Sequence, residues 1–376
     1  MKDLLELRDQ IDVIDDQIVS LYEKRMKIAE EVADYKIHTG KKVFDKKRED
    51  EKLKKLTEKA HSDFTKHGIY ELFEQIMAVS RKRQYQLLTA EGLTENTGFL
   101  EVGQLDYANA RIVFQGTEGA YSEQAMKTYF GEQCDSYHVD TWKDAMEAIK
   151  KKEADYAVLP IENSSAGIVS ENYDLLVEYD NYIVGEQIIK IEHALLGLPD
   201  ASLSDITNVY SHPQALMQCS DYLEAHRNWQ KISAPNTAIA ASRVSEETAV
   251  NHAAIASKIT ADIYNLKVLD EAIQNNKNNS TRFIIVTNKK VYSNKSSRIS
   301  ICFEIPHESG SLYHMLSHFI YNNINMTNIQ SRPIQNKNWE YRFFIDFEGG
   351  FKDTAVLNAL RGLDEETISL KILGTY

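Results

Sequence analysis

The sequence predicts a multidomain chain in which an all-helical segment is followed by an α/β segment and then an α+β segment of the ferredoxin-like kind. The first 90 residues contain no proline and only two glycines. From 111 to about 290, short strands alternate with helices, which indicates a mainly parallel sheet. From 298 the elements follow the order β-α-β-β-α-β. The expected boundaries are 1–90 for the helical domain, 91–109 for a linker, 110–290 for the α/β domain and 297–376 for the last domain.

Composition and charge are those of a globular protein with real cores. The 376 residues are 43% hydrophobic and 26% charged, and the net charge is −13. The first 90 residues carry 19 Lys+Arg against 18 Asp+Glu, and the other 286 carry 24 against 38, a balance of −14. A general nucleic-acid binder needs a basic face, which only the first segment could supply.

Neither a membrane span nor a metal site is expected. The sequence has no run of 18 apolar residues, and its start, MKDLLELRDQIDVIDD, lacks an apolar signal core. Cys134, Cys219 and Cys302 are far apart and adjoin no partner with metal-ligand spacing. We therefore expect a cytoplasmic protein without disulfide or zinc, and nothing in the sequence implies a nucleotide or other cofactor.

Polar side chains interrupt the apolar seams of the first segment. A heptad seam is formed by Leu4, Leu7, Ile11, Ile14, Ile18 and Leu21. The same register places Arg25 at an apolar position, and Lys36 lies three turns later on nearly the same face. Ser80 and Gln84 interrupt a second helical stripe. Each could snorkel to solvent, but polar groups from two helices facing one core indicate a polar pocket, because unpaired buried polar groups are costly.

The stretch VFDKKRED lies between these helices. Asp45 can cap a helix there, with Arg48 and Glu49 one turn in, although a solvated helix start explains these three residues alone. The whole set resembles the all-helical chorismate mutase family over about residues 1–90. The site residues of that family map onto Arg8, Arg25, Lys36, Asp45, Arg48, Glu49, Ser80 and Gln84.

The resemblance implies the rearrangement of chorismate to prephenate, which needs no proton transfer. Catalysis then comes from holding a compact conformer and from donors aimed at the ether oxygen. The implied roles are carboxylate clamps for Arg8, Arg25 and Arg48, ether-oxygen contacts for Lys36 and Gln84, a ring-hydroxyl contact for Glu49, and orientation of neighbours for Asp45 and Ser80.

Arg8 and Arg25 cannot reach one small dianion from the same chain. They are 17 residues apart, or about 25 Å along one helix at roughly 1.5 Å per residue. If both serve one site, Arg8 comes from another protomer. We therefore expect a helical dimer with two shared sites, and pairing of dimers into tetramers stays open.

Small polar groups follow several strands of the middle segment. RIVFQG and DYAVLPIE are expected strands, the second ending at Pro160, and NVYSHPQAL is a strand running into a helix. The loops GTEGAYSE, IENSSAG and SHPQ and the TRF opening of NNSTRFIIVTN lie at such strand ends, where α/β sheets bind ligands. Each loop alone is ordinary turn chemistry, but four together favour a shared anion-binding cleft. The fingerprint G-x-G-x-x-G is absent, which argues against a fused nicotinamide-dependent dehydrogenase.

The motifs FQGTEGAYSE, PIENSSAG, YSHPQAL and NNSTRF resemble prephenate dehydratases over about residues 110–290. The resemblance implies two α/β lobes around a cleft, similar to periplasmic-type binding domains. The chain would cross to the second lobe after about 185 and return near 275. The essential threonine of that family maps onto Thr281, and the other implied substrate-binding positions are Thr117, Glu162, Asn163, Ser164, Ser211, His212, Gln214, Arg282 and Phe283.

The implied reaction removes carbon dioxide and the ring hydroxyl from prephenate to give phenylpyruvate. The departing hydroxide needs a hydrogen-bond donor or an acid. Thr281 is a poor acid, so we expect it to donate within a network that has Glu162 and His212 as titratable neighbours. Arg282 is expected to hold a carboxylate, with structural pairing as its alternative. Helix capping or packing is the alternative for His212.

The last segment contains ESGSLYHML and MTNIQSRPI, which resemble an ACT domain of the phenylalanine-responsive kind. The implied amino-acid site comprises Gly310, Ser311, Leu312, Asn328, Ser331, Arg332 and Pro333. Two positions depart from the family: Tyr313 is bulky, and Gln330 replaces the usual acid, so capture of an ammonium group is weakened. A dimerisation module without a ligand is the alternative interpretation.

These observations together predict a bifunctional enzyme that converts chorismate through prephenate to phenylpyruvate, with feedback by phenylalanine. One alternative is a chorismate mutase fused to a prephenate dehydrogenase. The other is a chorismate mutase fused to a non-catalytic amino-acid sensor with a binding-protein-like cleft. Transfer of prephenate between the two sites stays open.

Overall fold

The computed structural model describes residues 3–93, 97–335 and 337–376. The chain divides into two compact units, one of Met1–Thr97 with Ile301–Ile372 and the other of Gly98–Ser300 with Leu373–Tyr376. Residues 1–2 of the expected helical domain and 94–96 of the expected linker lie outside the described residues. The sequence predicted three domains and did not predict that its first and last segments belong to one unit.

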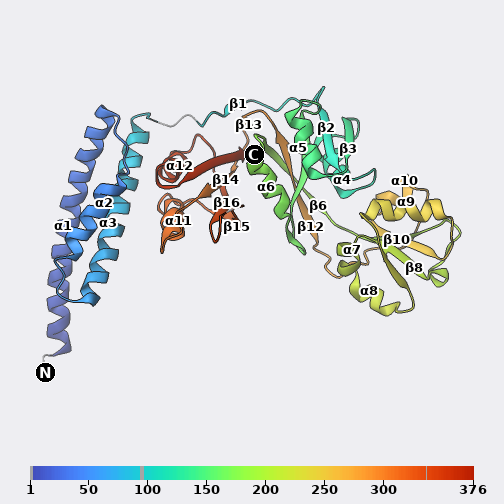
Figure 1. Cartoon of the computed structure of the whole chain (residues 1–376), viewed down its shortest axis with the longest axis horizontal. Helices are drawn as coiled ribbons and strands as arrows, with labels where there is room; N and C mark the ends of the chain where they lie inside the picture. The colour runs from blue at the N-terminus through green and yellow to red at the C-terminus, as the bar shows by residue number, and fades with distance from the viewer. Residues whose placement is uncertain (1–2, 94–96, 336) are drawn as a thin grey trace. The chain divides into compact units, whose positions relative to one another are not determined.

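The first segment is all-helical, as expected (Figure 1, blue). It consists of α1 (Leu4–Thr39), α2 (Lys46–Thr57) and α3 (Asp63–Ala90). Helix α1 is followed by Gly40, which caps its C-terminal end with a left-handed φ of 66° that suits glycine. Asp45 caps α2 by accepting a hydrogen bond from the Arg48 backbone N–H at 3.1 Å.

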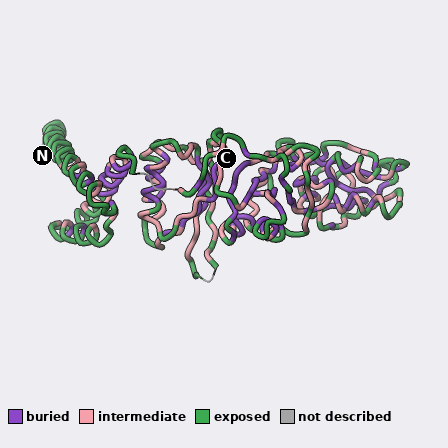
Figure 2. The backbone as a smooth tube through the Cα atoms, turned by 90° about the horizontal axis from the view of Figure 1, so that it is seen from above, coloured by how far each residue is buried: buried purple, intermediate pink, exposed green. Residues whose placement is uncertain are grey.

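The predicted heptad seam of α1 is exposed in the single chain. Its six apolar side chains are 40–65% exposed, and Figure 2 shows the N-terminal part of this helix in green. The other end of α1 packs on α3, with Ala33 fully buried beside Val43, Tyr85 and Leu88. An apolar stripe of this length on one helix is typical of a surface that another chain covers.

The rest of the first unit has the expected βαββαβ order. It contains α11 (Ser311–Tyr321), β15 (Met326–Pro333), β16 (Tyr341–Glu348) and α12 (Thr354–Glu366), with residues 301–304 of β14 (Arg298–Glu304) and 369–372 of β17 (Ser369–Thr375). The strands are ordered β15-β16-β14-β17. Phe303, Phe319, Phe344 and Phe347 fill the core, and α12 packs against α3 of the helical segment.

The second unit has two lobes, as the resemblance implied. In the first lobe the strands are ordered β6-β12-β4-β2-β3. Their bounds are β2 (Arg111–Gln115), β3 (Asp135–Val139), β4 (Tyr156–Asn163), β6 (Tyr182–Lys190) and β12 (Ser280–Thr287), and the helices are α4 (Tyr121–Phe130), α5 (Trp142–Lys150) and α6 (Ser170–Glu178). Strand β12 runs antiparallel to both β4 and β6, so the sheet is mixed, whereas a mainly parallel sheet was expected.

Strand β4 continues past Pro160 to Asn163, so the expected end at Pro160 was wrong. The pairing with β12 shifts register at this point, from Glu162 opposite Arg282 to Pro160 opposite Phe283. Proline cannot donate a ladder hydrogen bond, and such an irregularity lets the strand carry it. Glu162 and Asn163 are thereby part of the strand.

The second lobe lies between β6 and β12 in the sequence and has its own sheet, ordered β11-β7-β10-β8-β9. Its strands are β7 (Ala194–Gly197), β8 (Asn208–Ser211), β9 (Gln230–Ser233), β10 (His252–Ala256) and β11 (Lys267–Asp270). Its helices are α7 (Pro213–Gln218), α8 (Ser220–Ala225), α9 (Thr237–Glu247) and α10 (Ile259–Ile263). The chain thus leaves the first lobe after Lys190 and returns at Ser280, slightly later than predicted at both crossings.

The remaining elements of the second unit are short. Strand β1 (Leu100–Val102) pairs in parallel with β13 (Val291–Ser293). The other two are β5 (Gly167–Ile168) and a 3-10 turn at Leu203–Asp205. Among the described residues, none of the helices combines the length and apolar character needed to cross a membrane.

We expect Gly374→Ala to destabilise the second unit. A methyl group at Gly374 would lie 2.0 Å from the backbone oxygen of Ile183, its partner in β6. That oxygen cannot move without breaking the pairing, so the unfolding free energy should fall by about 2 kcal/mol or more. Denaturant unfolding measures this loss. Gly103→Ala is the control, because nothing lies within 4 Å of the added methyl; equal stabilities of the two variants would contradict the prediction.

Candidate active sites

Helices α1 and α3 bring the predicted polar side chains of the first segment together. The Arg25 guanidinium donates to the Ser80 hydroxyl at 2.5 Å, and the Lys36 ammonium donates to Gln84 Oε1 at 3.1 Å. Gln84 Nε2 donates to the Ser80 carbonyl at 3.2 Å. The polar groups that interrupt the seams are therefore paired across the helices, as buried polar groups must be.

The two cations of this cluster are half-buried. Burial lowers the pKa of the Lys36 ammonium, and the carboxylates of Glu365 and Glu49 oppose that shift. Burial likewise lowers the pKa of Arg25, against Tyr22 and Glu49. Partly desolvated cations at one place make a site that an anionic ligand would stabilise.

Helix α2 supplies the next three predicted residues. Asp45 caps the helix, Arg48 is exposed in the first turn, and the Glu49 carboxylate forms an ion pair with Arg81 of α3. Burial raises the pKa of Glu49, and Arg81 opposes this rise. Sequence reasoning missed Arg81, because no periodic pattern distinguishes it from its neighbours in SRKRQ.

Arg8 does not join this cluster within one chain. It lies on the same continuous helix as Arg25, near the opposite end, and is exposed. The separation of about 25 Å along the axis follows from the rise of roughly 1.5 Å per residue. Of the eight predicted positions, the chain thus brings seven into one region and leaves Arg8 apart.

In the second unit, Thr281 lies near the start of β12, opposite Asn163 of β4. The Asn163 amide Nδ2 donates to Thr281 Oγ1 at 2.9 Å and to Asn279 Oδ1 at 2.9 Å. Thr281 is only 9% exposed. Because its oxygen accepts from Asn163, the hydroxyl proton of Thr281 is available to donate elsewhere.

The loop after β4 determines which way the Asn163 amide points. Asn163 Oδ1 accepts from the backbone N–H groups of Ser165 at 3.0 Å and Ala166 at 2.8 Å, so Nδ2 is left to face Thr281. Ser164 Oγ accepts from the Ser280 N–H at 2.9 Å, which ties the loop to the start of β12. The IENSSAG motif therefore acts as a support for Thr281.

Arg282 has structural partners, which was the alternative to binding a substrate carboxylate. Its Nε donates to Glu186 Oε2 at 2.8 Å and its Nη2 donates to the Tyr376 hydroxyl at 2.5 Å. Successive side chains of a strand point to opposite faces, so Arg282 points away from the face of Thr281. These contacts agree with the structural pairing named as its alternative, and a carboxylate-binding role for Arg282 stays a prediction. Phe283 is 3% exposed and belongs to the core of the first lobe.

The SHPQ residues have structural partners. Ser211 is fully buried and donates to the Ile255 carbonyl at 2.6 Å, which links β8 to β10. His212 Nδ1 accepts from the Gln214 N–H at 3.2 Å and caps α7, the alternative named for it. Burial lowers the pKa of His212, which favours the neutral ring that can accept this bond.

The GTEGAYSE loop contacts the second lobe. The Tyr264 hydroxyl donates to the Glu118 carbonyl at 2.9 Å, next to the half-buried Thr117. At the crossing between the lobes, the Tyr121 hydroxyl lies 3.2 Å from His193 Nδ1. His193 Nε2 lies 2.9 Å from Gln218 Oε1 in the second lobe. Sequence reasoning missed His193, although Tyr121 lies within a motif that it singled out.

The predicted amino-acid site of the last segment lies on α11 and β15. Gly310, with φ of 83°, precedes Ser311 and Leu312 at the start of α11. On β15, Gln330 Nε2 donates to Asn328 Oδ1 at 3.1 Å, so the Gln330 side chain is paired within the strand. Ser331, Arg332 and Pro333 end the strand.

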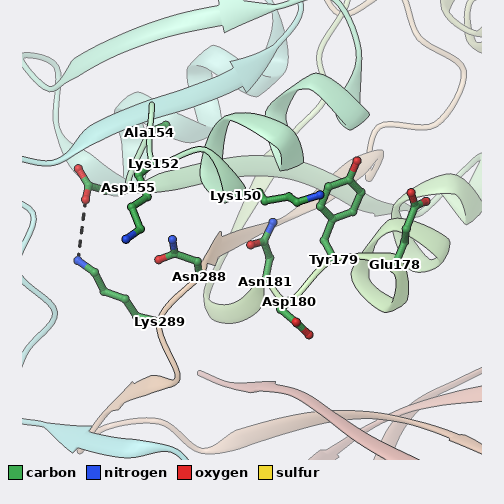
Figure 3. A pocket seen from close by; sticks show the side chains of 10 residues that line it. All are labelled: Lys150, Lys152, Ala154, Asp155, Glu178, Tyr179, Asp180, Asn181, Asn288 and Lys289. Atoms are coloured by element: carbon green, nitrogen blue, oxygen red, sulfur yellow. Dashed lines mark ion pairs between the residues drawn. The ribbon is translucent and has the colours of Figure 1, made fainter.

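A cavity of about 780 Å³ in the second unit lies away from Thr281. Figure 3 shows that lysines and acids line it, with Lys289 pairing with Asp155 at 3.8 Å. Asn288, also in its wall, directly follows β12, so it is about 23 Å along the strand from Thr281 at roughly 3.3 Å per residue. None of the predicted residues lines this cavity.

Two family models match the chain. Chorismate mutase type II matches residues 7–85, and prephenate dehydratase matches residues 112–291. The bifunctional chorismate mutase/prephenate dehydratase of Escherichia coli K12 is 31% identical over 380 residues, covering 99% of this chain and 96% of that protein.

Solved structures similar to the chain include two prephenate dehydratases. One, from Arthrobacter aurescens in complex with L-Phe, is 29% identical, with a TM-score of 0.66 over 71% of this chain and 89% of that chain. The other, from Staphylococcus aureus, is 26% identical, with a TM-score of 0.63 over 71% of this chain and 99% of that chain.

Proposed function

The chain belongs to the bifunctional chorismate mutase/prephenate dehydratase family, and from that membership we propose which of its residues carry the two reactions. Its activities are those of phenylalanine biosynthesis, from chorismate to prephenate and on to phenylpyruvate. The match over 112–291 is to a dehydratase, so neither the dehydrogenase fusion nor the sensor alternative has support. We assign the mutase reaction to the helical cluster and the dehydratase reaction to Thr281 and its support.

The cross-helix pairs support the mutase assignment. In the rearrangement one C–O bond breaks while one C–C bond forms, and negative charge grows on the ether oxygen. Lys36 and Gln84, held together at 3.1 Å, would donate to that oxygen from a preorganised position. Arg25 and Arg48 would hold the carboxylates, and Glu49 would accept the ring hydroxyl. Asp45 and Ser80 keep α2 and Arg25 in place through their hydrogen bonds.

A homodimer would complete the mutase site. The apolar seam of α1 is exposed in the single chain, and Arg8 lies far from Arg25 on the same helix. Pairing two copies along this seam would bury it and bring the partner's N-terminal turns to each cluster. The arginine at position 8 of one protomer would then serve the site of the other.

One observation carries the dehydratase assignment: the Asn163 amide donates to the Thr281 oxygen. Prephenate loses carbon dioxide, the released electron pair makes the ring aromatic, and the ring hydroxyl departs with a proton as water. Thr281 would donate its hydrogen bond to that hydroxyl as negative charge builds on it. Glu162 lies opposite Arg282, so strand alternation turns it away from the face of Asn163 and Thr281, and it is not assigned the proton.

The last segment would act as the regulatory ACT domain. The Arthrobacter relative was solved with L-Phe, and the last segment of this chain has α11 and β15 in a βαββαβ order. Loop amides near Gly310–Leu312 and the end of β15 would hold the amino acid. With Gln330 in place of an acid, the ammonium group would be held weakly.

Thr281→Ala should lower the kcat of phenylpyruvate formation by about 100-fold or more, the usual loss when one preorganised donor is removed. Thr281→Ser keeps the hydroxyl and should retain most of the activity. Mutase activity of both variants, measured as prephenate formed from chorismate, should equal that of the wild type. Equal dehydratase activity of the alanine and serine variants would refute the role of Thr281.

Mixing inactive Arg8→Ala and Arg25→Ala proteins after denaturation should restore about a quarter of wild-type mutase activity. Half of the reassembled dimers are mixed, and each has one intact site of two if the sites are shared. A mixture of Arg25→Ala and Lys36→Ala is the control and should restore none, because both residues serve a site from the same chain. Restoration in the control, or none in the test, would count against shared sites.

Gln330→Glu should strengthen inhibition of the dehydratase by L-phenylalanine. A carboxylate there would offer a charge-assisted partner to the ammonium group, worth about a tenfold lower half-inhibitory concentration. Inhibition curves with the wild type and the variant measure the shift. A variant that responds to phenylalanine as the wild type does would place the ammonium elsewhere.

A further inference from the structure

Arg81 joins two carboxylates that come from the first and last segments of the first unit. Its Nη1 pairs with Glu49 Oε2 of α2. Its Nε and Nη2 donate to Glu366 Oε1 and Oε2 of α12 at 2.8 and 3.0 Å. The guanidinium also lies over the Phe44 ring at 4.9 Å. Arg81 is 8% exposed, so these partners hold a buried cation in one orientation.

The end of α12 is fixed against the helical segment by further contacts. Glu365 Oε2 accepts from the Phe44 N–H at 2.8 Å and from the Tyr85 hydroxyl at 3.2 Å. His318 Nε2 lies 3.4 Å from Glu366 Oε1. Two acids at the C-terminal end of a helix are disfavoured by its dipole, so Arg81 supplies the charge that lets this end be buried.

A cavity of about 310 Å³ adjoins this network within the first unit. Glu49, Arg81 and Glu366 line it together with Ser311 and His314. A residue of the proposed mutase site and a residue of the proposed regulatory loop thus border the same space. The arginine between them has contacts to both segments.

We propose that Arg81, anchored by Glu366 of the last segment, is a positioning residue of the mutase reaction that orients the Glu49 carboxylate toward the ring hydroxyl of chorismate. The inference rests on the role proposed above for Glu49. Arg81 occupies Oε2 of Glu49, and among the described residues Oε1 has no hydrogen bond and is left to accept. The mutase site is then completed by Glu366, which lies 285 residues after Arg81 in the sequence.

The charges around Glu49 determine its protonation. Facing it are Arg81 from α3, Glu366 from α12, and Lys36 and Arg25 from α1. Burial raises the pKa of Glu49, and Arg81 gives the largest opposing effect. Without Arg81, the carboxyl would take up its proton at a higher pH and lose the negative charge that makes it a strong acceptor for the hydroxyl. Mutase activity would then fall as the pH is lowered through this raised pKa and recover at higher pH.

The test is the pH profile of kcat/KM for the mutase reaction of the full chain. In Arg81→Ala, kcat/KM at pH 7 should fall about tenfold. The acidic limb of its pH profile should move to higher pH by about one unit. Arg81→Lys keeps a cation beside Glu49 and should restore most of the activity and the wild-type limb. A purely structural arginine would lower activity equally at all pH values.

Two further variants separate anchoring from charge. Glu366→Gln leaves Arg81 in place but weakens the ion pair that holds it, so mutase kcat/KM should fall less, by about threefold. Arg81 would still oppose protonation of Glu49. Arg83→Ala is the matched control. Arg83 is two residues away on α3, its side chain is 40% exposed, and it pairs with Glu30 at 2.7 Å. Its mutase profile should equal that of the wild type.

Dehydratase activity and the helical circular-dichroism signal of each variant report folding. If Arg81→Ala does not fold, Arg81→Lys and Glu366→Gln decide, and wild-type kcat/KM in both overturns the inference. A wild-type profile for a folded Arg81→Ala also overturns it. Glu49→Gln separates the role of Glu49 from that of Arg81. Full mutase activity in Glu49→Gln refutes the proposed role of Glu49. Loss of activity in Glu49→Gln together with an unchanged pH profile in Arg81→Ala refutes only the positioning role of Arg81.

Discussion

The first unit contains a buried guanidinium, and a buried cation needs anions beside it. Arg81 has Glu49 on one side and Glu366 on the other, and removing either would leave an uncompensated charge in a poorly solvated place. Against the effect of burial, the contact with His318 and then the charge of Arg81 hold the pKa of Glu366 down to about 2. The helical segment and the last segment therefore stabilise each other through charge, although the chain between them forms a separate unit.

Local patterns were sufficient to predict most elements and part of each site. The heptad spacing predicted α1, and the apolar FIIV run predicted the buried part of β12. The polar interruptions predicted a polar pocket between two helices but not its Arg25–Ser80 and Lys36–Gln84 pairs. Periodicity reports on one element and its nearest partner. It carries no information on Arg81 and Glu366, whose contact depends on how distant segments pack.

Short polar residues at strand ends were the weakest basis for prediction. Thr281, Arg282 and Ser211 have similar surroundings in the sequence, yet only the first presents a donor that is not used by the fold. Arg282 pairs with Glu186, and Ser211 donates to a neighbouring strand. The alternation of a strand and the antiparallel pairing of β12 decide these outcomes, and a mixed sheet could not be inferred from strand–helix alternation alone.

The chain enters and leaves the second lobe at two residues that lie opposite each other in the sheet of the first lobe. Lys190 at the end of β6 lies opposite Ser280 at the start of β12, so residues 191–279 form an insertion whose two ends are adjacent. Insertions of this kind are tolerated because the host loses none of its strands when they are removed. The first lobe with Thr281 and Asn163 could therefore be closed by a hairpin turn in place of the lobe, giving a minimal scaffold in which substrate enclosure is separated from the hydroxyl chemistry.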